Sequence, residues 1–210
     1  MAKKLISQGA EAKIFLEDNI ISKERIPKGY RHPQLDIQIR TKRTKSEAKI
    51  LIKALEVGVL VPKVLNINSR GIPKDKFNLE IEYLKGDRLS ETLNSYPEKK
   101  QFKIMEQLGE QVAKLHQNNI IHGDLTTSNT ILREDCVFII DFGLGFISLK
   151  TEDKAVDLHL IKQALEAKHF SIYKEAEKII LEGYNNKDKT KVLEQLKKVE
   201  ARGRYRKNVE

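Results

Sequence analysis

The chain has 210 residues but only one cysteine, Cys136. A single thiol excludes an internal disulfide framework, and it cannot supply the several cysteines of a thiolate metal site. Because Cys136 begins the apolar run Cys-Val-Phe-Ile-Ile, we expect it to be buried in the core.

Long apolar runs are also absent. No segment approaches the roughly 20 residues of a membrane-spanning helix, and the first residues, MAKKLISQGAEAK, lack the apolar stretch of a secretory signal peptide. We therefore expect a cytosolic protein without membrane contact. The 40% hydrophobic and 33% charged residues, with charges spread along the chain, predict a globular protein. The length excludes a large multidomain enzyme.

Basic residues exceed acidic ones by 39 to 30, which gives a net charge of +9. This balance favours polyanionic partners such as RNA. One cluster lies between residues 23 and 45, and a second closes the chain with Arg202, Arg204, Arg206 and Lys207. A solvated surface and, for the second, a frayed tail remain alternatives for these clusters.

The first 85 residues have mainly strand patterns. Residues 14–16 and 20–21 flank the turn sequence Glu-Asp-Asn and predict a hairpin. The proline-containing stretch 25–36 is too polar for a central strand. A helix is predicted from Ser46 to a stop near Gly58, followed by strands at 64–67 and 79–84.

After Gly86 the pattern is mainly helical. We predict helices at about 98–118, 153–169, 171–184 and 188–201, with short strands at 130–132 and 137–140. Together the two halves predict an α+β fold with two lobes and a cleft between them. The expected division is an N-terminal lobe at 1–85, a C-terminal lobe at 86–201 and a basic tail at 202–210.

The most informative segment is HGDLTTSN at 122–129, followed by Asp141-Phe142-Gly143. Asp124, the amide of Asn129 and a second carboxylate, Asp141, behind an apolar strand predict a cradle for a metal and phosphates. Phosphoryl transfer requires such a cradle, because its transition state spreads negative charge over several oxygens. We assign Asp124 to orient the attacking group and accept its proton, and Asn129 and Asp141 to hold Mg²⁺.

These residues resemble the catalytic loop and the metal-binding D-F-G of the protein-kinase superfamily. The resemblance implies bound ATP and Mg²⁺. It also implies that Lys23 contacts the nucleotide phosphates, that Glu47 pairs with Lys23, and that the backbone of Glu82 and Leu84 faces adenine.

Three departures distinguish the chain from that pattern. The glycine-rich phosphate loop is reduced to a segment with one glycine, in which the backbone of Gly9, Ala10 and Glu11 would approach the phosphates. Thr126 replaces the lysine that many Ser/Thr kinases carry near the catalytic aspartate. Few residues separate Asp141 from the next predicted helix and no A-P-E follows, so a peptide substrate has little surface to lie on.

With these departures, the strings KGYRHPQLD and HGDLTTSN and the terminal Arg-Gly-Arg resemble one family, the kinase-like ATPase subunit of the KEOPS complex. The resemblance covers about residues 8–206, and it extends more distantly to the RIO-type atypical kinases. It implies a cytosolic partner of the threonylcarbamoyl-transferase subunit and other KEOPS subunits. That assembly forms threonylcarbamoyladenosine at position 37 of tRNA. The resemblance also implies ATP hydrolysis, Ser/Thr autophosphorylation and a tRNA contact by the basic tail.

Two alternatives stay open. The chain could be a Ser/Thr protein kinase that recognises separate substrates through residues 40–45, or a non-catalytic RNA-binding adaptor with a kinase shape. We further expect His122 to brace the catalytic loop by packing and hydrogen bonding, and His116 and His159 to bind no metal. Asp157 either ties its helix to the catalytic loop or is a solvated helix residue.

Overall fold

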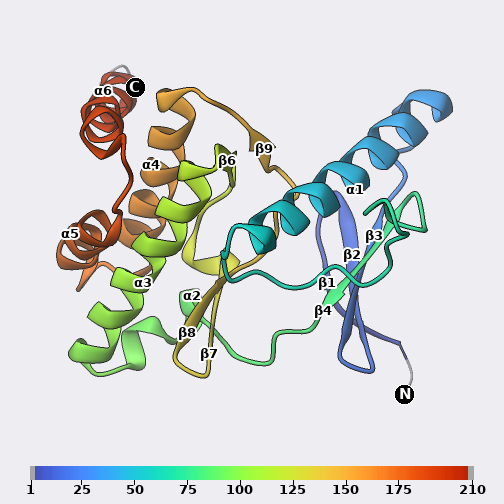
Figure 1. Ribbon diagram of the computed structural model, residues 1–210, viewed down its shortest axis with the longest axis horizontal. Helices are drawn as coiled ribbons and strands as arrows, with labels where there is room; N and C mark the ends of the chain where they lie inside the picture. The colour runs from blue at the N-terminus through green and yellow to red at the C-terminus, as the bar shows by residue number, and fades with distance from the viewer. Residues whose placement is uncertain (1–2, 208–210) are drawn as a thin grey trace.

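The computed structural model describes residues 3–207, and the side chains through Arg202. Figure 1 shows two parts: at the right a sheet crossed by one long helix, and at the left a group of helices. The chain is therefore a mixed α and β structure of two lobes, as its sequence predicts.

The N-terminal lobe contains an antiparallel sheet of β1 (Lys4–Gln8), β2 (Ala12–Glu17), β3 (Ile20–Arg25) and β4 (Asn78–Glu82), in that order. Asp18 and Asn19 both adopt positive φ, 45° and 63°, as the two residues of a tight hairpin turn require. The predicted hairpin is confirmed. Strand β1 escapes sequence prediction because all five of its residues are exposed and leave no alternating pattern.

Helix α1 (Pro33–Glu56) crosses this sheet. The prediction of a start near Ser46 is wrong, because the helix begins more than three turns earlier. Pro33 suits the first turn, where its missing N–H has no partner to lose. The early turns bury no apolar side chain and contain ion pairs such as that of Arg40 Nε with Asp36 Oδ2, 2.6 Å.

The predicted strand at 64–67 is also wrong. Only isolated bridges occur there, from Val64 to Ile81 and from Ile67 to Pro73. The side chain of Asn66 replaces part of the ladder, since its Oδ1 accepts from Glu80 N at 3.0 Å and its Nδ2 donates to Asn78 O. An asparagine amide competes in this way with regular strand pairing.

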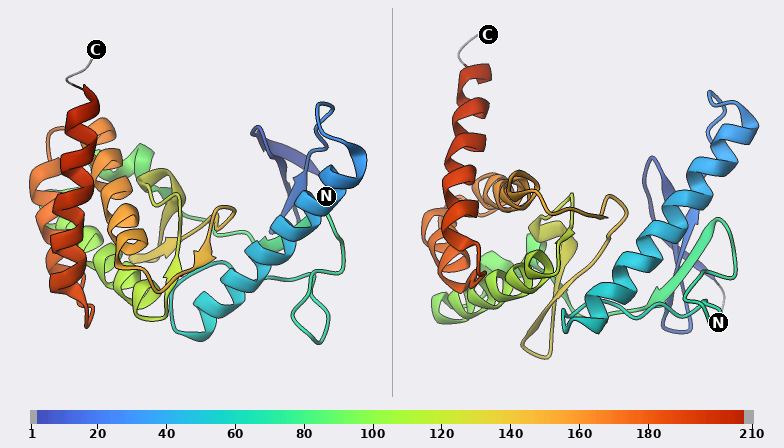
Figure 2. Two further views of the ribbon diagram at one scale, coloured as in Figure 1. Left: turned by 90° about the horizontal axis from the view of Figure 1, so that it is seen from above. Right: turned by 45° about the horizontal axis from the view of Figure 1, so that its top comes forward.

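The C-terminal lobe contains α2 (Leu89–Thr92), a 3₁₀ turn (Leu93–Ser95), α3 (Glu98–Gln117), α4 (Thr151–Lys168), α5 (Tyr173–Gly183) and α6 (Lys189–Lys207). The four predicted helices are confirmed. Helix α6 continues through part of the basic segment and lies at the end of the molecule away from the sheet (Figure 2). No helix in residues 3–207 is long and apolar enough to cross a membrane.

Short strands position the catalytic loop in this lobe. Strands β5 (Asp87–Arg88), β7 (Thr130–Arg133) and β8 (Cys136–Ile139) form one sheet, while β6 (Ile120–Ile121) pairs with β9 (Phe146–Ile147). The prediction that Cys136 is buried is wrong. It is exposed at the start of β8, whereas Val137 and Ile139 face the core.

One continuous core connects the lobes. Buried Ala48 and Leu51 of α1 belong to the same cluster as Leu108 of α3 and Phe142. The segment after α1 strengthens this connection, because Ile139 N of β8 donates to Leu60 O at 2.9 Å. The two lobes are therefore tied together behind the cleft.

Candidate active site

A cleft of about 710 Å³ lies between the lobes. Its volume suits a nucleotide-sized ligand, for which pockets of roughly 300–1,000 Å³ are typical. Apolar and charged side chains both line it. The apolar ones include Ile6, Ile14, Leu16, Ile21, Leu84, Ile131 and Ile140, and the polar ones include Lys23, Glu47, Asn129 and Asp141.

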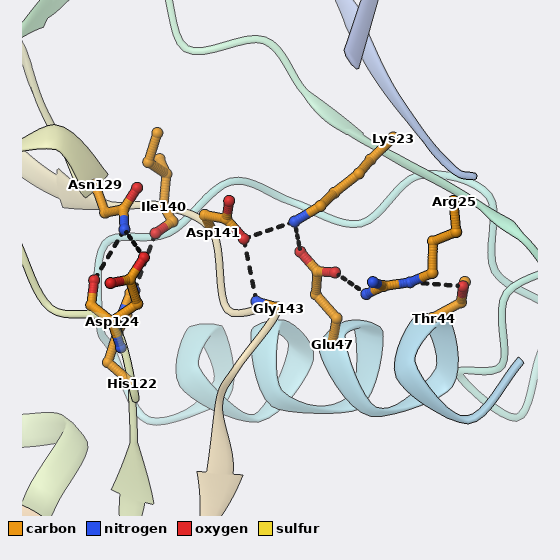
Figure 3. A network of polar contacts seen from close by, with 10 residues as sticks. All are labelled: Lys23, Arg25, Thr44, Glu47, His122, Asp124, Asn129, Ile140, Asp141 and Gly143. Carbon is orange, nitrogen blue, oxygen red and sulfur yellow. Dashed lines mark hydrogen bonds and ion pairs between the residues drawn. The ribbon is translucent and has the colours of Figure 1, made fainter. Parts of the chain in front are cut away.

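Lys23 is the centre of an ion-pair network across the cleft (Figure 3). Its Nζ lies 2.8 Å from Glu47 Oε1 of α1 and 2.6 Å from Asp141 Oδ1, so β3, α1 and the D-F-G segment meet at one ammonium. Burial by itself lowers the pKa of Lys23, but the two carboxylates outweigh it and leave that pKa above its ordinary value. Lys23 is therefore a fixed cation.

Asp141 has a constrained backbone and a half-exposed side chain. Its φ of +62° is rare for a residue with a side chain, and such strain concentrates at functional sites. Desolvation raises the pKa of Asp141, yet Lys23 and the Gly143 N–H outweigh it and the net pKa lies below the ordinary value. The carboxylate is therefore ionised and ready to face a cation.

Asp124 and Asn129 lie side by side in the C-terminal lobe, across the cleft from Lys23. Asn129 Nδ2 donates to Asp124 O at 2.8 Å and to Asp124 Oδ2 at 2.9 Å. His122 joins this pair to the D-F-G segment, since its Nε2 donates to Ile140 O at 3.0 Å while its Nδ1 accepts from Asp124 N. His122 is fully buried, so the expected bracing role agrees with its contacts.

Asp157 of α4 anchors the catalytic loop by accepting hydrogen bonds from its backbone. Its Oδ2 accepts from His122 N at 2.6 Å and its Oδ1 from Gly123 N at 2.8 Å, and the side chain is fully buried. Gly123 has a φ of +80°, a backbone conformation that glycine adopts readily. Of the two alternatives for Asp157, the tie to the loop is confirmed.

The oxygens present fit a hard divalent cation. Asn129 directs both of its donor contacts at Asp124, and within residues 3–207 its Oδ1 has no hydrogen-bond donor. Asp141 uses Oδ1 for Lys23 and Gly143, so Oδ2 is similarly unengaged in that part of the chain. An amide oxygen and a carboxylate oxygen are ligands that Mg²⁺ prefers. Among the described residues no group of three or more His, Cys, Asp or Glu side chains could hold a metal ion, and the absence of metal binding by His116 and His159 stays a prediction.

The predicted hinge residues border the cleft. Glu82 ends β4, and its Oε1 accepts from Arg133 at 2.9 Å, while Leu84 is buried against the lining. Both residues line the cleft. Their contact with adenine stays a prediction.

The predicted phosphate loop is tied to the basic segment. Gly9 N donates to Ala12 O at 3.0 Å, Lys28 Nζ donates to Ala10 O, and Glu11 pairs with Arg43 at 2.6 Å. These three residues do not line the cleft, whereas Ile6 and Ser7 of β1 do. A direct phosphate contact by Gly9, Ala10 and Glu11 stays a prediction.

The basic tail is only partly described. Arg202 is exposed and pairs with Glu152 of α4. The backbone of Arg204, Arg206 and Lys207 belongs to α6, but their side chains lie outside the described part of the chain.

Sequence reasoning missed two polar residues beside Glu47. Arg25 Nη2 donates to Glu47 Oε2 at 2.6 Å, and its Nε donates to Thr44 Oγ1 at 3.2 Å. The spacing of Lys23 and Arg25 was the only available signal, because alternate residues of a strand share a face.

Comparisons with known proteins give a consistent picture. A family model described as a protein kinase domain matches residues 8–160. The KEOPS complex subunit Bud32 of Pyrococcus abyssi is 42% identical, over 97% of this chain and 96% of that protein.

Two longer relatives resemble the chain over part of their length. A probable bifunctional tRNA threonylcarbamoyladenosine biosynthesis protein of Methanococcus vannielii is 38% identical over 97% of this chain. The corresponding protein of Methanocaldococcus jannaschii is 39% identical over 96%. The chain spans only 36% and 37% of these two proteins.

A solved structure of WaaP in complex with acyl carrier protein shares the fold, with a TM-score of 0.66 over 94% of this chain and 87% of that one. At 11% identity, the likeness concerns the fold alone.

Proposed function

Because the chain belongs to the protein kinase domain family and to the family of KEOPS complex subunits that includes Bud32, we propose that it hydrolyses Mg²⁺-ATP in support of tRNA threonylcarbamoyladenosine synthesis. One observation carries the proposal. Lys23, Asn129 and Asp141, which come from both lobes, border a single nucleotide-sized cleft, and Asp124 is hydrogen-bonded to Asn129.

Each of these residues has a distinct task in the proposal. Lys23, fixed by two carboxylates, neutralises phosphate charge. Asn129 and Asp141 offer oxygens to Mg²⁺, which supplies further charge neutralisation when bound. Asp124 receives the Asn129 amide on Oδ2, and its Oδ1 is left to orient an attacking water and take its proton.

The apolar side chains hold the base. Ile14, Ile21 and Ile131 line the cleft beside Leu84, and flat aromatic rings bind well between aliphatic surfaces. The backbone of Glu82 and Leu84 would recognise the adenine edge. The polar network lies deeper, toward Asp141, where the phosphates would lie.

The proposed partners are the threonylcarbamoyl-transferase subunit, other KEOPS subunits and tRNA. The relative names support this part of the proposal, since one is a KEOPS subunit and two are tRNA threonylcarbamoyladenosine biosynthesis proteins. The net charge of +9 suits a tRNA partner. Arg202, Arg204, Arg206 and Lys207 are the proposed contacts, and a cytoplasmic location follows from the same role.

Phosphate release tests the proposal. The full chain is assayed with ATP and Mg²⁺, with and without the transferase partner and tRNA, and Asp141→Ala provides the background. We expect wild-type release well above that background and a further increase with the partner. Release equal to that of Asp141→Ala under every condition would overturn the proposal.

Protein phosphorylation is the second candidate, since the catalytic residues are those of a kinase. Only β9 and turns lie between Asp141 and α4, which gives a peptide little to dock on. We therefore propose autophosphorylation on Ser or Thr as a side reaction. Radiolabel transferred efficiently to a separate protein would favour the kinase alternative. Binding of tRNA without any binding of Mg²⁺-nucleotide would favour the non-catalytic adaptor.

A further inference from the structure

Arg25 is a second buried cation on β3, and the kinase pattern assigns it no role. Its side chain is only 4% exposed, and Glu47, its partner, is 2% exposed. Glu47 Oε1 accepts from Lys23 at 2.8 Å while Oε2 accepts from Arg25 at 2.6 Å (Figure 3). One buried carboxylate is therefore held between two cations.

Thr44 fixes the orientation of this arginine. Arg25 Nε donates to Thr44 Oγ1 at 3.2 Å, and the same hydroxyl donates to Arg40 O one turn earlier. Thr44 is fully buried. A guanidinium can make both contacts at once because its donors form a rigid fork, which an ammonium lacks.

The spacing of the four residues matches strand to helix. Lys23 and Arg25 are two apart on β3 and share its face toward α1. Thr44 and Glu47 are three apart on α1 and share a helix face. The two side chains of the strand contact the two side chains of the helix. These contacts fix both the rotation of α1 about its axis and its position along β3.

The charges of the network balance. Lys23 and Arg25 oppose Glu47 and Asp141, which gives two cations for two carboxylates. Without Arg25, buried Glu47 would depend on Lys23 alone. Glu47 would then lose its counter-ion whenever the ammonium of Lys23 turned toward a phosphate. A buried carboxylate is destabilising without a close cation.

We propose that Arg25 is a positioning residue that keeps Glu47 directed at Lys23 in every state of the site, so that the ion pair is permanent. The inference rests on the proposed function and deepens it by naming how the site is kept competent. In many protein kinases the position of the corresponding helix depends on a phosphorylated activation segment. Here α4 begins at Thr151, soon after Asp141. Arg25 and Thr44 instead hold α1 in position from within the N-terminal lobe.

A double-mutant cycle tests the inference. Arg25→Met, Glu47→Gln and the double variant are compared with wild type by equilibrium binding of Mg²⁺-ADP, by turnover and by thermal unfolding. We expect Arg25→Met to weaken nucleotide binding at least about tenfold. The double variant should bind no worse than Glu47→Gln alone, because Arg25 acts through Glu47. Lys49→Met, an exposed change on the same helix, should bind like wild type.

Arg25→Lys supplies a milder variant should Arg25→Met fail to fold. An ammonium can pair with Glu47 but cannot also bridge to Thr44, so we expect a partial recovery of affinity. A purely structural role would lower the unfolding temperature and leave the affinity of the folded fraction unchanged.

The two proposals fail in different ways. Wild-type protein that neither binds nor hydrolyses nucleotide overturns the proposed function, and this inference with it. Active wild-type protein whose Arg25→Met variant keeps full nucleotide affinity overturns the inference alone. Additive losses in the double variant would also overturn it.

Discussion

At Gly143 the backbone passes directly beneath the charged groups of the cleft. A Cβ at this position would stand 3.0 Å from Asp141 Oδ1 and 3.2 Å from Lys23 Nζ. The N–H of the same residue donates to Asp141 Oδ1 at 3.1 Å. A side chain here would therefore be in tight contact with both Lys23 and Asp141.

Gly143→Ala should therefore displace Lys23 or Asp141. We expect a loss of Mg²⁺-nucleotide affinity of roughly tenfold, measured by calorimetric titration, with a smaller change in the unfolding temperature. Gly29→Ala is the matched control, since no atom lies within 4 Å of a Cβ there. Equal affinity of the two variants would contradict the role given to Gly143.

Asp157 provides a test of the loop anchor. Asp157→Ala leaves the buried N–H of His122 and the half-buried N–H of Gly123 without an acceptor. Each unsatisfied donor costs about 1–3 kcal/mol, so for the two donors we expect a loss of roughly 2–6 kcal/mol in the free energy of unfolding. Urea denaturation measures it. Val156→Ala, the partly exposed neighbour on α4, should cost less than about 0.5 kcal/mol.

At the residue scale, the spacing of the sequence motifs predicted which side chains belong to the site. The ion pair of Lys23 with Glu47 agrees with the pairing that the kinase resemblance implies. The contact of Lys23 with Asp141 was not predicted. The partners of that core were not readable, because Arg25 and Glu47 are 22 residues apart and neither spacing nor composition links them. A tertiary contact between two positions that belong to no sequence motif leaves no local pattern in the sequence.

Helix α1 shows what happens at the scale of an element. Its second half was predicted from the apolar positions that include Ile50, Leu51 and Ala54, which are all buried. Its first half was not, because Asp36, Arg40 and Arg31 stabilise it by ion pairs. Binary patterning detects apolar burial and misses a helix that is held by charges.

The first turn of α1 gives a pH-dependent prediction. Burial alone raises the pKa of Asp36, but Arg40, Lys28 N and Arg31 outweigh it and hold that pKa below the ordinary 3.8. A carboxyl whose pKa is lowered on folding stabilises the fold above its unfolded pKa, and this contribution disappears as the pH falls through its folded pKa.

Asp36→Asn should accordingly lower the unfolding temperature by a constant amount at neutral pH. The difference from wild type should shrink once the pH falls below 3.8. Thermal unfolding followed by circular dichroism over a pH series measures both. Gln38→Ala, an exposed change on the same helix, should show no such trend. A difference that grows toward acid pH would contradict the assignment.

Considered as a whole molecule, the two lobes share one core and one charged network. Leu60 is hydrogen-bonded to Ile139 of β8, and Lys23 links β3 to Asp141 across the cleft. The C-terminal helices stack away from the sheet, with Lys162 of α4 pairing to both Glu177 and Glu200. Residues of both lobes therefore line a single cleft.

Equilibrium binding of ADP with and without Mg²⁺, to wild type and to Asp141→Ala, tests the central claim most directly. The account predicts that Mg²⁺ tightens binding to wild type at least about tenfold and that Asp141→Ala loses this gain while it stays folded. Equal Mg²⁺ dependence in the two proteins would contradict it, because the carboxylate assigned to the cation would then be dispensable.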